Sequence, residues 1–73
     1  MRITGIEFTN AGQAIQQAKA SQHGKAITVD GKVLVVEQAE AERLASAGIE
    51  FAYLVDHQMP DGKHRIMTIP VND

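Results

Sequence analysis

The stretch FAYLVDHQMPDGKHRIMTIPV, residues 51–71, carries the strongest structural signal in the sequence. It contains two runs rich in β-branched and aromatic residues, separated by Pro60, Asp61 and Gly62. Pro60 presets the turn, and Gly62 can adopt the positive φ of a three-residue hairpin loop that ends in a bulge. The stretch therefore predicts a long β-hairpin.

The turn fixes which residues of this hairpin oppose each other. Met59 lies opposite Lys63, and counting outward gives four further pairs on one face: His57–Arg65, Val55–Met67, Tyr53–Ile69 and Phe51–Val71. A slip of one residue would move this largely apolar set into water, so we expect the register to hold. We also expect this face to pack beneath the helices. Pro70 has no N–H to donate, which places the last strand at a sheet edge.

A second Asp-Gly-Lys turn, residues 30–32, predicts a shorter hairpin earlier in the chain. An Asp-Gly pair tolerates the positive φ values of a two-residue turn. The predicted pairs are Val29–Lys32, Thr28–Val33, Ile27–Leu34 and Ala26–Val35. Neither face of this hairpin is polar, which indicates a strand pair that is covered on both sides or is paired into an interface.

Helices are predicted before each hairpin. Asn10 is a potential N-cap with Gln13 at capping-box spacing, and alanines then recur at helical intervals, so we expect a helix over residues 11–21. Residues 37–47 are mostly strong helix formers and predict a second helix. Residues 2–9 predict a short N-terminal strand.

The resulting order is β-α-β-β-α-β-β within one small domain, residues 1–73. We expect an α+β fold: a two-layer sandwich with two short helices on one face of a mainly antiparallel sheet of four or five strands. A central N-terminal strand would make it a ferredoxin-like variant. Otherwise two αββ halves, a duplicated unit, would lie side by side. The pattern also leaves open whether the N-terminal strand pairs within or between chains.

Composition narrows the function classes. The charges are scattered, with 7 basic and 9 acidic residues and a net charge of -2, and aromatics are only 4% of the chain. A nucleic-acid binder typically shows a basic stripe, so we expect no nucleic-acid partner. No apolar run has the length of a membrane span, no apolar leader region opens the sequence, and cysteine is absent. We therefore expect a cytoplasmic protein with no membrane association.

Potential catalytic or metal-binding side chains gather only around the second turn. They are Asp56, His57, Asp61 and His64. The predicted register places His57 and His64 on opposite faces, so they would not share one ion. Phosphate-binding glycine loops, zinc-helix motifs and nucleophile elbows are missing from the sequence. We expect no catalytic residues, no metal and no cofactor, and we lean against an enzyme.

His57 and Arg65 are the one candidate ligand-binding pair. They end the apolar face of the long hairpin, where Arg65 could bind a carboxylate or phosphate in bidentate fashion. We favour a small non-enzymatic interaction module that binds a protein partner, or itself as a homodimer, through a sheet surface or edge. The alternative is a small anionic-ligand binder, or a minor enzyme subunit, with its site near His57 and Arg65. Small size and mild acidity also allow an inhibitor of a nucleic-acid-handling complex.

Overall fold

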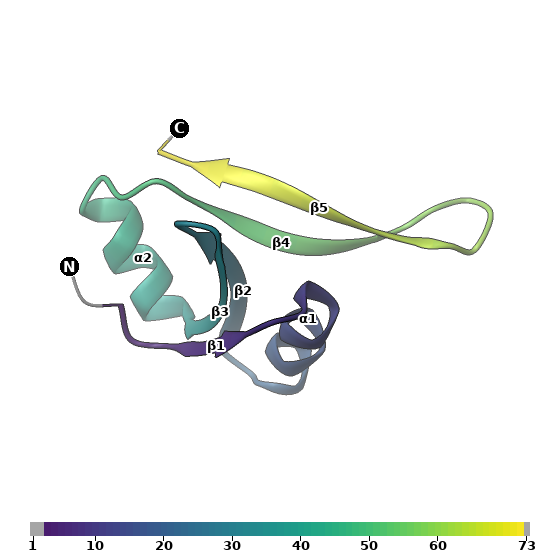
Figure 1. Cartoon of the computed structure of the whole chain (residues 1–73), viewed down its shortest axis with the longest axis horizontal. Helices are drawn as coiled ribbons and strands as arrows, with labels where there is room; N and C mark the ends of the chain where they lie inside the picture. The colour runs from purple at the N-terminus through teal and green to yellow at the C-terminus, as the bar shows by residue number, and fades with distance from the viewer. Residues whose placement is uncertain (1–2, 73) are drawn as a thin grey trace.

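The computed structural model describes residues 3–72 and has the α+β architecture expected from the sequence. Its elements follow the predicted order (Figure 1). They are β1 (Ile6–Phe8), α1 (Ala11–Ala20), β2 (Gly24–Val29), β3 (Lys32–Glu37), α2 (Gln38–Ser46), β4 (Phe51–Gln58) and β5 (His64–Val71). The strands form one five-stranded sheet in the order β1-β3-β2-β4-β5, and every neighbouring pair is antiparallel. The predicted fold class and element order are confirmed.

The N-terminal strand lies at one edge of the sheet. It spans Ile6–Phe8 and pairs with β3 of the same chain, whereas Arg2, where we expected it to begin, lies outside the described residues. The two hairpins then meet through β2 and β4. The element order is still that of a ferredoxin-like variant, but the first strand does not insert centrally. The sheet instead sets two hairpins side by side, as in the duplicated arrangement.

Both turns have the predicted geometry. Asp30 and Gly31 have φ values of 51° and 74°, as a two-residue hairpin turn requires. Gly62, with φ of 87°, donates its N–H to the Met59 carbonyl at 3.0 Å, and the Met59 N–H donates to the Lys63 carbonyl at 2.7 Å. Every predicted cross-strand pair in both hairpins is confirmed.

The helices also begin and end within a residue or two of the predicted positions. The Asn10 side chain accepts a hydrogen bond from the Gln13 N–H at 3.1 Å and so caps α1. Glu37 is the last residue of β3 and the N-cap of α2, so that helix begins one residue later than expected. Gly48, with φ of 77°, follows its end.

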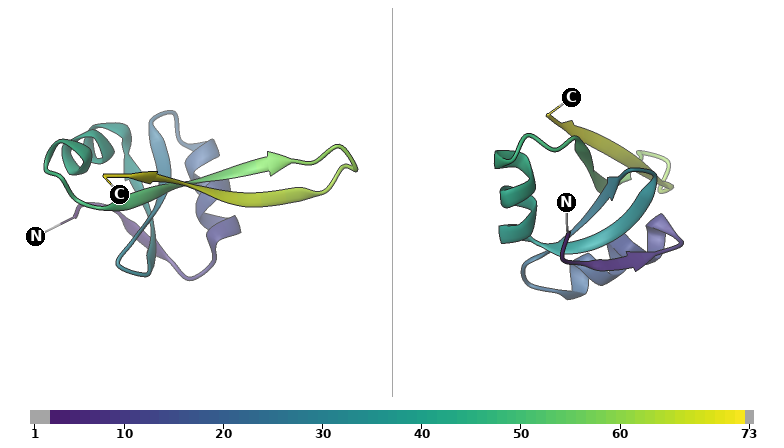
Figure 2. Two further views of the ribbon diagram at one scale, coloured as in Figure 1. Left: turned by 90° about the horizontal axis from the view of Figure 1, so that it is seen from above. Right: turned by 60° about the vertical axis from the view of Figure 1, so that its left-hand side comes forward.

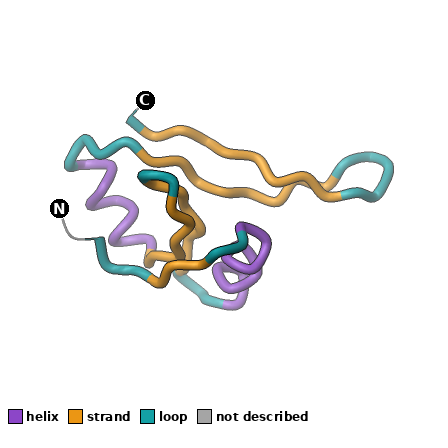
Figure 3. Tube along the Cα trace, viewed as in Figure 1, coloured by secondary structure: helices purple, strands orange, loops and turns teal. Residues whose placement is uncertain are grey.

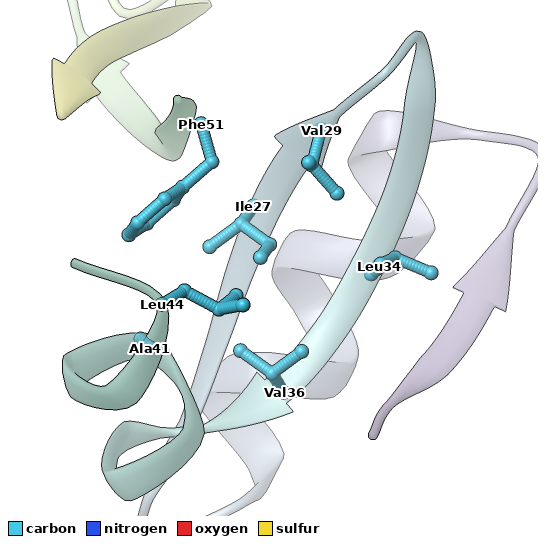
Figure 4. Close-up of a cluster of buried hydrophobic side chains, with 7 residues drawn as sticks. All are labelled: Ile27, Val29, Leu34, Val36, Ala41, Leu44 and Phe51. Carbon is cyan, nitrogen blue, oxygen red and sulfur yellow. The ribbon is translucent and has the colours of Figure 1, made fainter. Parts of the chain in front are cut away.

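The two helices lie on opposite faces of the β2–β3 hairpin, so the expectation of a two-layer sandwich with both helices on one face is wrong. Figure 2 shows the hairpin between them. On one face α1 packs against Ala26 and Val35; on the other α2 packs against the cluster drawn in Figure 4. That cluster comprises Ile27, Val29, Leu34, Val36, Ala41, Leu44 and Phe51. Because both faces of this hairpin are apolar, each needs a cover, and one helix supplies each cover.

Candidate functional site

The β4–β5 hairpin projects beyond the rest of the molecule. Its strands have eight residues each, but β2 pairs with β4 only through Tyr53 and Ala52 in the described part of the chain. Figures 1 and 3 show the hairpin continuing past β2 and both helices to its turn. A two-stranded ribbon of this kind is marginally stable on its own in water. Its outer part therefore lacks the support that the rest of the sheet has.

Exposed apolar side chains concentrate on β5. Within residues 3–72, four large hydrophobic side chains are exposed, and three of them lie on this strand: Ile66 (46%), Met67 (47%) and Ile69 (52%). The fourth is Ile6, at the opposite edge of the sheet. Together Ile66, Met67 and Ile69 give the outer strand apolar side chains on both of its faces, since neighbouring residues of a strand point to opposite sides.

The expected cover of the hairpin's apolar face is only partly present. Phe51 is buried and its ring meets that of Tyr53 edge-on, with centroids 5.4 Å apart. Tyr53 and Val55 are half-buried, but Met67 and Ile69 are exposed, so the expectation that the whole face packs beneath a helix is wrong. The reason is the position of α2, whose buried side chains pack over β2, β3 and Phe51 and reach β5 only at Val71.

The outer edge of β5 carries free backbone groups. The Met59–Lys63 hydrogen bond marks a bonded pair, and bonded and non-bonded pairs alternate along an antiparallel ladder. Residues 65, 67, 69 and 71 therefore direct their backbone groups toward β4, while residues 64, 66, 68 and 70 direct theirs outward. Pro70 falls in the outward set, which explains how a residue without an N–H fits this strand. The edge thus offers three N–H donors, from His64, Ile66 and Thr68.

His57 and Arg65 lie directly opposite each other, as the register predicted. Both are exposed near the tip of the hairpin, on the same face as Tyr53. Neither side chain makes a hydrogen bond or ion pair with another residue in the described range 3–72. The pair is therefore available to solvent but is not enclosed.

The opposite face brings Asp56 and His64 together, and adds Lys19 from α1, which the sequence did not suggest. The Asp56 carboxylate lies 3.3 Å from Lys19 Nζ and 3.1 Å from His64 Nδ1. Burial raises the pKa of Asp56, but the hydrogen bonds and charges of Lys19 and His64 outweigh it, so the pKa is lowered. Asp61 instead accepts the Lys63 N–H within the turn at 3.0 Å. Among residues 3–72, no three histidine or acidic side chains converge as a metal site.

A hollow of about 650 Å³ is lined by the N-terminal segment, the end of β3 and residues at both helices. Its lining includes Ile6, Gln17 and an ion pair in which Arg43 Nε lies 2.7 Å from Glu40 Oε1. The Arg43 hydrogen bond and the Thr4 N–H, 2.7 Å from Glu40 Oε2, lower the pKa of Glu40 from its usual 4.5 to about 2. The Glu40 carboxylate is therefore already bound by donors of the chain itself, the Thr4 N–H and the Arg43 guanidinium.

No helix in the described residues is long and apolar enough to cross a membrane. Comparison with models of protein families, with curated proteins and with solved structures finds no match to the chain.

Proposed function

We propose that the chain is a small, non-enzymatic interaction module that self-associates through the outer edge of the β4–β5 hairpin. The observation that supports this proposal best is the row Ile66, Met67 and Ile69 on a free edge strand. Natural edge strands are usually shortened, charged or covered, because free backbone groups recruit other strands. β5 is eight residues long, and its central run Ile66–Ile69 carries no charge.

The two edges of the sheet differ in the way the proposal requires. β1, at the other edge, has only three residues, and among residues 3–72 its exposed Ile6 has no apolar neighbour of comparable exposure. β5 offers more than twice that length, together with three outward N–H donors. Addition of a strand at such an edge gains main-chain hydrogen bonds and specificity from side-chain contacts. A cytoplasmic location is part of the proposal.

The mass of the protein in solution tests it. We expect sedimentation or light scattering over a dilution series to give twice the chain mass of 7.9 kDa at high concentration, and the chain mass on dilution. Thr68→Pro removes an outward N–H but no hydrogen bond to β4, and should leave a folded monomer. Glu7→Pro is the matched control, because the same alternation directs the Glu7 N–H outward from β1; it should still dimerise. A wild-type chain that is monomeric throughout would contradict the proposal.

A second candidate, binding of small anions at His57 and Arg65, has one observation in its favour. The two side chains are directly opposite, exposed and unpaired within residues 3–72, so the Arg65 guanidinium is not already neutralised. Titration with inorganic phosphate and with acetate, followed by NMR, would test this. We expect shifts of His57 and Arg65 that disappear in Arg65→Gln and spare His23, and equal shifts at both histidines would exclude a site.

A further inference from the structure

We infer that two copies pair β5 against β5 in antiparallel register, with Met67 facing the partner's Met67 on the two-fold axis. The result is a continuous ten-stranded sheet built from two five-stranded sheets. This inference rests on the proposed function, because it names the partner, a second copy, and the alignment through which that function would act.

The alignment follows from which backbone groups are free. A two-fold axis must pair outward-facing residues with outward-facing residues, so it passes midway between one residue and the same residue of the second copy. With the axis at Met67, the Ile66 N–H donates to the carbonyl of the partner's Thr68. The Thr68 N–H donates in turn to the carbonyl of the partner's Ile66. The His64 N–H then meets the carbonyl of the partner's Pro70. Every outward-facing N–H group on both copies then has an acceptor. Pro70 has no N–H, so it adds no donor that would need one.

Neighbouring alignments are less favourable. An axis at Thr68 leaves the His64 N–H beyond the end of the partner strand. An axis at Ile66 uses all the donors, but it lays residues 69–71 against the partner's turn, where Gly62 has a φ of 87° and the chain is not extended. The Met67 alignment pairs residues 64–70 with themselves in reverse, so the overlap lies within β5 and includes all three N–H donors.

Side chains suit the same alignment. Arg65 faces the partner's Ile69, and Lys63 faces the partner's Val71, so no two like charges are directly opposed across the axis. On the other face of the sheet, Ile66 faces the partner's Thr68. The three exposed hydrophobic side chains of β5 therefore all gain neighbours from the second copy. This self-complementarity is what a two-fold interface requires, and it points to a second copy rather than to an unrelated strand.

The chain has no cysteine, so single cysteines report the alignment directly. Met67 and the partner's Met67 form a non-bonded pair, with Cα atoms about 4.5 Å apart. That separation is within the range a disulfide spans. We expect Met67→Cys to form a covalent dimer on mild oxidation. Ile69→Cys is the control, because Ile69 is about as exposed as Met67. In this alignment Ile69 faces the partner's Arg65, so it lies four positions (69 − 65), or about 13 Å, from the partner's Ile69. It should stay uncrosslinked alone.

A mixed experiment sharpens the result. Arg65→Cys and Ile69→Cys should each fail to crosslink with themselves but should form a heterodimeric disulfide when mixed, because these positions face each other. Crosslinking of Ile69→Cys alone would overturn the alignment. A wild-type dimer without any Met67→Cys crosslink would overturn the alignment while leaving self-association intact. A wild-type chain that stays monomeric would overturn both.

Discussion

The two hairpins of this molecule share an Asp-Gly-Lys turn but have opposite surroundings. β2–β3 lies between two helices, and Ile27 at its centre is completely buried. β4–β5 is longer, contacts the two core clusters through Phe51, Tyr53, Leu54 and Val71, and ends in solvent. Both are rich in β-branched residues, and both registers are set by an Asp-Gly turn. The difference teaches that a strand's apolar content reveals that it needs a cover, but does not reveal whether the same chain supplies it.

Replacing the same residue type in each hairpin should give the largest contrast. Ile27→Ala leaves a cavity beneath α2 and should lower the free energy of unfolding by about 2–5 kcal/mol. For the whole chain of 73 residues we expect a free energy of unfolding of roughly 4–11 kcal/mol. Ile69→Ala removes an exposed side chain and should change the free energy by about 0.5 kcal/mol or less. Urea denaturation followed by circular dichroism measures both.

The measurement should be made at protein concentrations at which the chain is monomeric, because a second copy would stabilise the wild-type β4–β5 hairpin. An Ile69→Ala loss as large as that of Ile27→Ala would mean that β5 is already covered within a single chain. The contrast between the hairpins would then be wrong.

The sequence predicted local structure well and the packing of elements less well. Turn residues and period-two alternation fix hairpin registers locally, so pairs such as His57–Arg65 were predicted correctly. The side of the sheet on which each helix lies depends on long-range packing. Neither face of the β2–β3 hairpin is polar, which indicated that both faces of this hairpin are covered. That indication conflicted with the expectation of a two-layer sandwich. The contact of Lys19 with Asp56 joins residues 37 positions apart, and no local pattern reveals it.

Destabilising each turn by a Gly→Ala substitution should distinguish an effect on global unfolding from an effect on local opening. Gly31 and Gly62 both have positive φ, and an added Cβ would touch nothing within 4 Å at either position. Alanine therefore has the same local cost at both, about 1–2 kcal/mol, from backbone conformation alone. In Gly31→Ala this cost should appear in global unfolding, because opening that turn disrupts the buried hairpin.

In Gly62→Ala the same cost should appear mainly as faster amide exchange near the tip, with a smaller change in global stability. The tip can open without exposing the core, so it behaves as a separate low-stability unit. Hydrogen exchange by NMR on both variants measures this. Equal losses of global stability in Gly31→Ala and Gly62→Ala would show that the hairpins unfold as one unit.

The smallest effects should come from the surface carboxylates that tie each region together. Glu40 holds the Thr4 N–H on the helix-covered side, and its pKa falls from 4.5 unfolded to about 2 folded. A lowered folded pKa stabilises the protein above the unfolded value, and this contribution is lost as the pH falls from 4.5 toward 2. The difference in urea midpoint between wild type and Glu40→Gln should therefore be largest at neutral pH and should fade across that window.

Asp56→Asn is the matched control for this effect, because Asp56 ties α1 to the projecting hairpin rather than to the N-terminal segment. At neutral pH, Glu40→Gln should speed amide exchange at Thr4, whose N–H loses its charged acceptor, whereas Asp56→Asn should not. If Asp56→Asn speeds exchange at Thr4 as much as Glu40→Gln does, the two regions communicate through the sheet. The outer hairpin would then be coupled to the covered one more tightly than its exposure indicates.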